Sequence, residues 1–133
     1  MKIVLDTNCL LVIIPKSSKY RKVYDNILNG KISLVVTSEI INEYEEKLID
    51  FYSNSVASNI IKLLKKLDNV EFKEIFYKFN LIPNDPDDNK FVDCAISSAA
   101  NFIVTNDKHY NVLDSIKFPK VTHIKLEDFC KKI

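Results

Sequence analysis

Apolar residues along this chain follow two alternating patterns: short continuous runs, and longer segments with an apolar residue every three or four positions. The continuous runs are typical of strands buried on both faces of a parallel sheet. The wider spacing predicts amphipathic helices. The expected strands cover residues 3–5, 33–37, 102–105 and 121–126, and the expected helices cover 16–29, 38–48, a segment from Ser53 or Ser55 to 67, 88–100 and 127–132.

Local signals mark where several of these elements begin and end. Gly30 stands at the expected C-cap position of its helix, and Ser38 is expected to cap the next one. Residues 70–84 fit both periods, and we expect a short strand or extended segment there, with a Pro-containing turn at 83–86. Strands that alternate with helices predict an α/β fold, a three-layer α/β/α sandwich with a mainly parallel central sheet.

The composition agrees with one folded domain over residues 1–133. The chain has 133 residues, 47% of them apolar, so it can bury a core. One Gly and four Pro favour helices with short connections over a turn-rich all-β fold. The net charge of +1 neither indicates nor excludes a nucleic-acid partner.

Cysteine usage and the length of apolar runs bear on the cellular compartment. Cys9, Cys94 and Cys130 are scattered among apolar residues, which fits neither a disulfide framework nor a zinc knuckle. His109 and His123 are too few and too far apart for a zinc site. The N-terminus reaches an acid after three apolar residues, unlike a signal peptide, and no apolar run is long enough to span a membrane. We expect a cytoplasmic protein with reduced cysteines and no membrane partner.

Acidic residues stand where the predicted topology brings segments together. In an open parallel sheet, functional groups gather at the carboxyl ends of the strands. Asp6 ends the first strand, and Asp107 follows a later one. Glu43 and Asp93 lie in the first turns of two predicted helices, whose N-terminal ends return to the same edge, and both border an apolar face. We therefore expect Asp6, Glu43, Asp93 and Asp107 to meet at this edge.

Four carboxylates within a few ångströms repel one another unless a cation offsets their charge. Ligands that are all oxygen favour a hard divalent cation, Mg²⁺ or Mn²⁺, over zinc. Such a cation can activate a water molecule for attack on a phosphodiester. The predicted site therefore suits metal-dependent hydrolysis of a phosphodiester bond.

Each of these four acids also has an ordinary structural explanation. Asp6 could be a surface acid after an edge strand, and Asp107 could belong to a plain turn. Glu43 could pair with Lys47, four residues further on. Asp93 could be an early-helix acid that interacts with the helix dipole.

Three more aspartates precede the helix that contains Asp93. A Pro-containing turn followed by a helix favours Asp at the cap, and we assign Asp85 and Asp87 to that turn. Asp88 stays open between helix cap and metal ligand, because a capping side chain at this edge could reach the site.

Several polar residues beside the acids are candidates to orient them. Asn8, Thr105 and Asn106 flank Asp6 and Asp107, although each is also an ordinary turn residue. Lysines on the two predicted helices at 16–29 and up to 67 could line a nucleic-acid path or simply face solvent.

With these residues identified, the chain resembles the PIN-domain family of metal-dependent ribonucleases, in particular the bacterial branch of toxin components of toxin–antitoxin pairs. The matching stretches, in the family's order, are KIVLDTN, VVTSEIINEYEEKL and DPDDNKFVDCAISSAANFIVTNDKHY. By motif position, the family's acidic quartet falls on Asp6, Glu43, Asp93 and Asp107. The family often has Gly where this chain has Asn106, and the DPDD stretch is typical of this branch, which keeps Asp88 as a candidate ligand.

The resemblance implies a PIN-like sandwich, dependence on Mg²⁺ or Mn²⁺, and endonucleolytic cleavage of single-stranded RNA. It also implies a protein antitoxin that covers the site, and a homodimer. All of these are expectations that the sequence itself does not test.

Two other enzyme or signalling classes also begin with a strand that ends on an acid, but this chain lacks residues that they need. A phosphatase of the haloacid dehalogenase type needs a second Asp two residues after the first, where this chain has Asn8. A receiver domain needs an acid pair and a mid-chain phospho-acceptor, and both are missing. A catalytically weak PIN-fold module that works by binding protein or RNA remains the alternative, and absence of divalent-metal binding would favour it.

Overall fold

The computed structural model describes residues 1–133 and contains one five-stranded sheet in the order β3-β2-β1-β4-β5. Every neighbouring pair of strands is parallel. This confirms the predicted α/β fold with a parallel central sheet. The strands are β1 (Lys2–Leu5), β2 (Ser33–Val36), β3 (Val70–Phe72), β4 (Phe102–Val104) and β5 (His123–Ile124).

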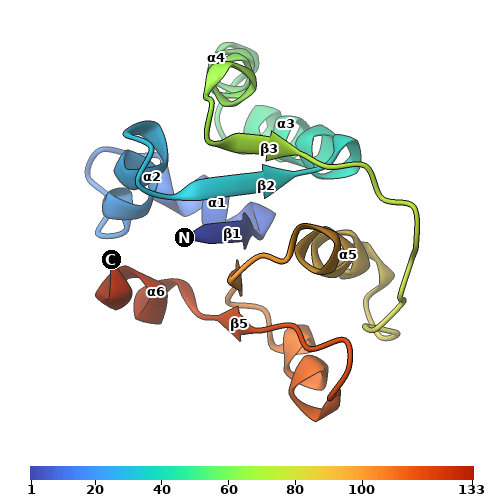
Figure 1. Ribbon diagram of the computed structural model, residues 1–133. Coiled ribbons are helices and arrows are strands. Elements are labelled where there is room, and N and C mark those ends of the chain that lie inside the picture. The colour runs from blue at the N-terminus through green and yellow to red at the C-terminus, as the bar shows by residue number, and fades with distance from the viewer.

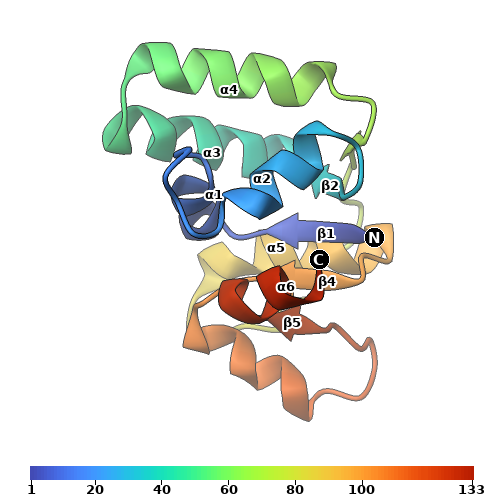
Figure 2. The ribbon, with the colours of Figure 1, turned by 90° about the vertical axis from the view of Figure 1, so that its left-hand side faces the viewer.

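Helices cover both faces of the sheet (Figures 1 and 2). Helix α5 lies on one face, whereas α1, α2 and α6 lie on the other, and α3 and α4 run side by side as a hairpin near β2 and β3. The α-helices are α1 (Thr7–Ile13), α2 (Arg21–Leu28), α3 (Ser38–Phe51), α4 (Asn54–Lys66), α5 (Asn89–Ser98) and α6 (Leu126–Lys132), and the 3-10 helices are η1 (Pro86–Asp88) and η2 (Lys108–Ser115).

The N-terminal part of the chain differs most from the prediction. Helix α1 begins directly after β1, and no helix was expected there. Five of the seven residues in its sequence, TNCLLVI, are buried, and the exposed face carries Asn8 and the apolar Val12, so polar residues give no clear helical period. The helix expected at 16–29 begins only at Arg21, while Gly30 has φ +83°, the left-handed conformation expected beyond a helix end.

Two helices have identifiable N-caps. Thr37, and not Ser38 as expected, caps α3, because its side chain accepts a hydrogen bond from Ile40 N at 3.2 Å. Ser53 caps α4 in the same way, accepting from Val56 N at 3.1 Å. The predicted cap of α3 lies one residue too late, because Thr37 and Ser38 are adjacent and both residue types suit the cap position.

The segment between β3 and α5 has no helix or strand from residue 73 to 85, as expected. It passes along the outside of the molecule before it reaches η1 (Figure 1). Two side chains of α5 hold it in place. Asn89 exchanges two hydrogen bonds with the backbone of Ile82, at 2.8 and 3.1 Å, and Asp93 accepts from Phe79 N at 3.0 Å.

The buried apolar side chains form one continuous cluster that includes the inner strands β1, β2 and β4. Cys9 and Cys94 are buried in it, Cys130 is half-buried, and all three are free thiols. Tested for length and apolar character, none of the helices qualifies as a membrane span.

Candidate metal site

Two acids lie side by side where β1 and β4 end. Leu5 of β1 pairs with Val104 of β4, and Asp6 N donates to Val104 O at 3.0 Å. Asp6 follows β1 directly and is only 7% exposed. Asp107 follows β4 by three residues and begins η2. As predicted, parallel pairing brings both acids to the carboxyl edge of the sheet.

Thr105 connects these two segments. Its Oγ1 donates to Asp6 Oδ2 at 2.7 Å and accepts a hydrogen bond from Asp107 N at 3.1 Å. Burial raises the pKa of Asp6, the bond from Thr105 lowers it in part, and the charges of Asp107 and Glu43 raise it further. Asp6 is therefore a fixed, buried carboxylate with other negative charges close by.

Glu43 reaches the same edge from α3. Its Oε2 accepts a hydrogen bond from Thr7 Oγ1, and its Oε1 lies 2.8 Å from Lys90 Nζ. Lys90 also donates to Asp87 O at 2.6 Å. The Glu43 carboxylate is thus positioned from both sides, by the residue after Asp6 and by the first turn of α5.

Asp88 points into this group from the start of α5. It is 8% exposed, and its Oδ2 is fully buried without a hydrogen bond that meets normal geometry. The Tyr110 hydroxyl, whose pKa is raised by burial and then by neighbouring acids that include Asp88, is likewise buried and unpaired. Burial, followed by the charges of Asp6, Asp85 and Asp107, raises its pKa to about 7, although His109 opposes the shift. A buried carboxylate oxygen that lacks a donor, among other acids, is a position that a cation would stabilise.

His109 and Asp85 complete the group. The imidazole Nδ1 lies 3.2 Å from Asp85 Oδ2, 3.3 Å from Asp107 Oδ1 and 3.8 Å from Asp88 Oδ2. One ligand atom from each of these four residues lies within 4.8 Å of the others. The sequence pattern predicts only a turn role for Asp85 and no zinc site at His109, whereas the structure places both residues against Asp88 and Asp107.

A local signal for His109 was present in the sequence. Asp107 caps the turn of η2 by accepting a hydrogen bond from His109 N at 2.8 Å, which folds the following residues back over the carboxylate. No comparable signal existed for Asp85, whose position depends on how the whole segment between β3 and α5 folds.

Asp93 does not join this group. Its Oδ1 accepts from Phe79 N, and its pKa is raised by burial, lowered by that bond and by Lys78, and raised by Glu39. None of the charged residues that shift the pKa of Asp88 contributes to the shift at Asp93. The structure therefore does not place Asp93 in this group, because five residues of helix separate it from Asp88 by about 140° of rotation and about 7.5 Å along the axis.

The remaining candidates have different surroundings. Asn8 is exposed on α1 and makes no side-chain hydrogen bond. Asn106 Oδ1 accepts from Leu126 N at 3.0 Å, so it ties the end of β4 to the start of α6. Of the three residues predicted to orient the acids, only Thr105 contacts one directly through its side chain.

The donor set fits a hard divalent cation. In addition to burial, the charge of Asp107 raises the pKa of both Asp6 and Asp88, and the charge of Asp6 also raises that of Asp88. The buried Oδ2 of Asp88 makes no hydrogen bond of normal geometry. Lys90 provides a cationic group, but it contacts Glu43, and the His109 imidazole lies at the exposed side. Carboxylate oxygens are the ligands that hard divalent cations prefer.

A parallel α/β domain with clustered acids at the carboxyl edge of its sheet defines a class of protein that binds divalent cations there. A family model described as the PIN domain matches residues 2–109 of this sequence. The chain belongs to the PIN-domain family, whose members are generally nucleases that depend on divalent metal.

Solved structures show the same fold at low sequence identity. VapBC2 from Rickettsia felis, bound to a DNA fragment from the promoter, is 16% identical with a TM-score of 0.64, covering 94% of this chain and 98% of that one. DNA-bound VapBC from Salmonella typhimurium is 15% identical with a TM-score of 0.63, covering 95% and 98%. The PIN-domain endonuclease Utp24 is 17% identical with a TM-score of 0.54, covering 93% and 84%. A search of curated proteins gave no match.

Proposed function

We propose that this protein is a Mg²⁺- or Mn²⁺-dependent endoribonuclease that cleaves single-stranded RNA, and that it is the toxin of a toxin–antitoxin pair. The observation that carries the proposal is the buried, unpartnered Oδ2 of Asp88 among the carboxylates of Asp6, Asp85 and Asp107. Membership of the PIN family and similarity to VapBC structures support a nuclease of the toxin type.

We assign the metal ligands to Asp6, Glu43, Asp88 and Asp107, directly or through water, and we place Asp88 in the role that sequence analysis gave to Asp93. The bound cation would lower the pKa of a coordinated water and offset negative charge on the phosphate. The acids come from four separate segments of the chain, so folding itself assembles the site.

The remaining side chains hold the acids in place. Thr105 fixes the Asp6 carboxylate by donating to Oδ2, and Thr7 fixes Glu43 by donating to Oε2. Lys90 offsets the charge of Glu43 at 2.8 Å.

The test is cleavage of an unstructured RNA with Mn²⁺ by purified protein. Asp6→Asn and Asp88→Asn should each reduce the rate by a factor of 100 or more, on the order of what loss of one electrostatic contact to the reacting groups costs. Asp50→Asn, an exposed acid on α3, should leave the rate unchanged. Cleavage at the wild-type rate by both site variants would contradict the assignment.

The partners follow from the same proposal. We propose RNA as the substrate, a protein antitoxin that covers the acidic site, a homodimer, and a cytoplasmic location. Native mass spectrometry tests the dimer. The alternative, a PIN-fold module that only binds protein or RNA, requires that calorimetry detect no Mn²⁺ binding near neutral pH.

A further inference from the structure

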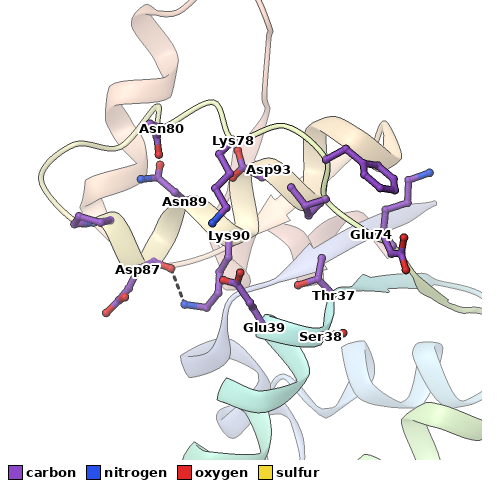
Figure 3. A pocket seen from close by; sticks show the side chains of 14 residues that line it. Thr37, Ser38, Glu39, Glu74, Lys78, Asn80, Asp87, Asn89, Lys90 and Asp93 are labelled. Atoms are coloured by element: carbon purple, nitrogen blue, oxygen red, sulfur yellow. Dashed lines mark hydrogen bonds between the residues drawn. The ribbon is translucent and has the colours of Figure 1, made fainter.

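A cavity of about 540 Å³ opens between the first turns of α3 and α5 (Figure 3). It is lined by the first turns of α3 and α5 and by the segment that follows β3. This volume is within the range of pockets that hold small molecules. None of the acids that we assign to the metal lines it, so the cavity is a separate compartment at the same edge of the sheet.

Lys90 connects the two compartments. It lines the cavity, and its Nζ lies 2.8 Å from Glu43 Oε1 in the metal site. Asp87 also lines the cavity, while the next residue, Asp88, points into the metal site. A substrate strand with one phosphate at the metal site would therefore have its neighbouring nucleotide at the cavity.

Asp93 forms the polar wall of the cavity. It is only 4% exposed, and its Oδ1 accepts from Phe79 N at 3.0 Å. Its Oδ2 accepts from no protein donor, and the residue lines the cavity beside Lys78 (Figure 3). Glu39, on the first turn of α3, lines the cavity as well. Acceptors that lack donors favour a ligand that brings N–H groups.

The segment after β3 supplies an aromatic side chain and positive charge. Phe76 lines the cavity and is 91% exposed, which is unusual for so large an apolar side chain. Lys73 and Lys78 flank it in sequence and also line the cavity. Exposed aromatic rings with nearby lysines are the usual means by which proteins bind single-stranded nucleic acids, through base stacking and phosphate contacts.

We propose that this cavity binds one base of the RNA strand, next to the phosphate at the metal site, and that it prefers guanine. The base stacks on Phe76 and donates its N1–H and N2–H to the carboxylate of Asp93. Guanine is the only one of the four RNA bases with two adjacent N–H donors on one edge. The carboxylates of Glu39, Glu74, Asp87 and Asp93 outnumber the lysines Lys73, Lys78 and Lys90, which argues against a phosphate as the ligand.

The inference rests on the proposed ribonuclease function only for the class of ligand, and binding tests it without cleavage. The Asp6→Asn/Asp107→Asn double variant would be titrated, in Mg²⁺, with labelled oligouridines that carry one central guanosine, inosine or adenosine. We expect guanosine to bind roughly tenfold more tightly than adenosine, as for a bidentate contact to a base. Inosine lacks the N2 amino group and should bind at an intermediate strength, a comparison that needs no substitution in the cavity.

Two substitutions added to the double variant then assign the preference to residues. Asp93→Asn keeps an oxygen acceptor for Phe79 N but places an amide against the base, so it should abolish the preference for guanosine. Phe76→Ala should weaken binding of every oligonucleotide about fivefold or more. Phe118 is also 91% exposed but lies outside the cavity, so Phe118→Ala should change nothing.

Equal affinity for guanosine, inosine and adenosine would overturn the inference, even if the wild type cleaves RNA. A guanosine preference in a protein that cleaves no RNA would contradict only the proposed nuclease function. If Asp93→Asn instead weakens binding of a tri-arginine peptide and leaves base preference unchanged, the cavity serves a protein ligand and the inference is wrong.

Discussion

Thr105 donates its hydroxyl hydrogen to Asp6 Oδ2 at 2.7 Å and so joins the ends of two neighbouring strands at the candidate metal site. The Oγ1 atom of Thr105 also accepts a hydrogen bond from Asp107 N at 3.1 Å. Thr105 is 2% exposed, and solvent cannot replace these bonds. One buried hydroxyl therefore fixes both a carboxylate and the backbone of the next acid.

Thr105→Val should weaken both stability and metal binding. Loss of a buried hydrogen bond to a charged acceptor costs about 1–3 kcal/mol in free energy of unfolding. Loss of a group that orients a metal ligand lowers affinity about 10–100-fold. Urea unfolding and calorimetry with Mn²⁺ measure the two effects. Thr105→Ser retains the hydroxyl and is the matched control, and equal Mn²⁺ affinity of the Val and Ser variants would argue against the orienting role.

A metal-binding experiment distinguishes the roles of Asp88 and Asp93. Asp88→Asn removes a buried acid beside Asp6 and Asp107, and its Mn²⁺ affinity should fall at least tenfold. Asp93→Asn should bind Mn²⁺ as the wild type does, because its carboxylate contacts Phe79 N and lines the neighbouring cavity. The reverse pattern would restore Asp93 as the ligand.

These two residues show how far sequence could locate the site. Asp6 and Asp107 follow directly from the rule that functional groups gather at the carboxyl ends of parallel strands. For the acid on α5, the sequence showed only that it lies near the helix start. Asp88 and Asp93 are five residues apart, so the rotation of the helix determines which of them faces the sheet edge. Contacts such as those from Asn89 to Ile82 set that rotation, and the apolar periodicity does not indicate them.

The fold itself was more predictable than the site. Strand and helix patterns predicted a parallel α/β sheet, which the structure has. Helix α1 was not predicted because its exposed face is only Asn8 and the apolar Val12, so its apolar run fits no particular period. The cavity was not predicted either, because it depends on how residues 73–85, which have no regular structure, lie over α3 and α5.

Lys90→Gln should destabilise the protein through Glu43. The ion pair is 2.8 Å long, and the two side chains are only 13% and 25% exposed, so Glu43 would lose its cation in a poorly hydrated position. We expect the free energy of unfolding to fall by about 1–3 kcal/mol in urea. Lys131 forms an exposed pair with Glu127 at 4.0 Å, so Lys131→Gln is the control and should change stability by about 0.5 kcal/mol or less. Equal losses in both variants would contradict the positioning role of Lys90.

Without divalent metal, stability should fall as pH rises from about 4 to about 7 and level off above that. Burial and neighbouring acids raise the pKa of Asp88 to about 7, from an ordinary value of about 4 in the unfolded chain. Its proton therefore stabilises the folded state fully below about pH 4, and this contribution is lost as pH passes through about 7. Thermal unfolding in a chelator from pH 5 to 8 should show a decline that Asp88→Asn flattens and that Mg²⁺ reverses. Parallel curves for wild type and variant would show that Asp88 titrates normally.

Anomalous diffraction from crystals grown with Mn²⁺ tests the central claim, the position of the metal. The account predicts an anomalous peak about 2.0–2.5 Å from carboxylate oxygens of Asp6, Asp88 or Asp107, and none at Asp93. A peak at Asp93, or no peak at the edge of β1 and β4 in crystals of a protein that cleaves RNA with Mn²⁺, would contradict it.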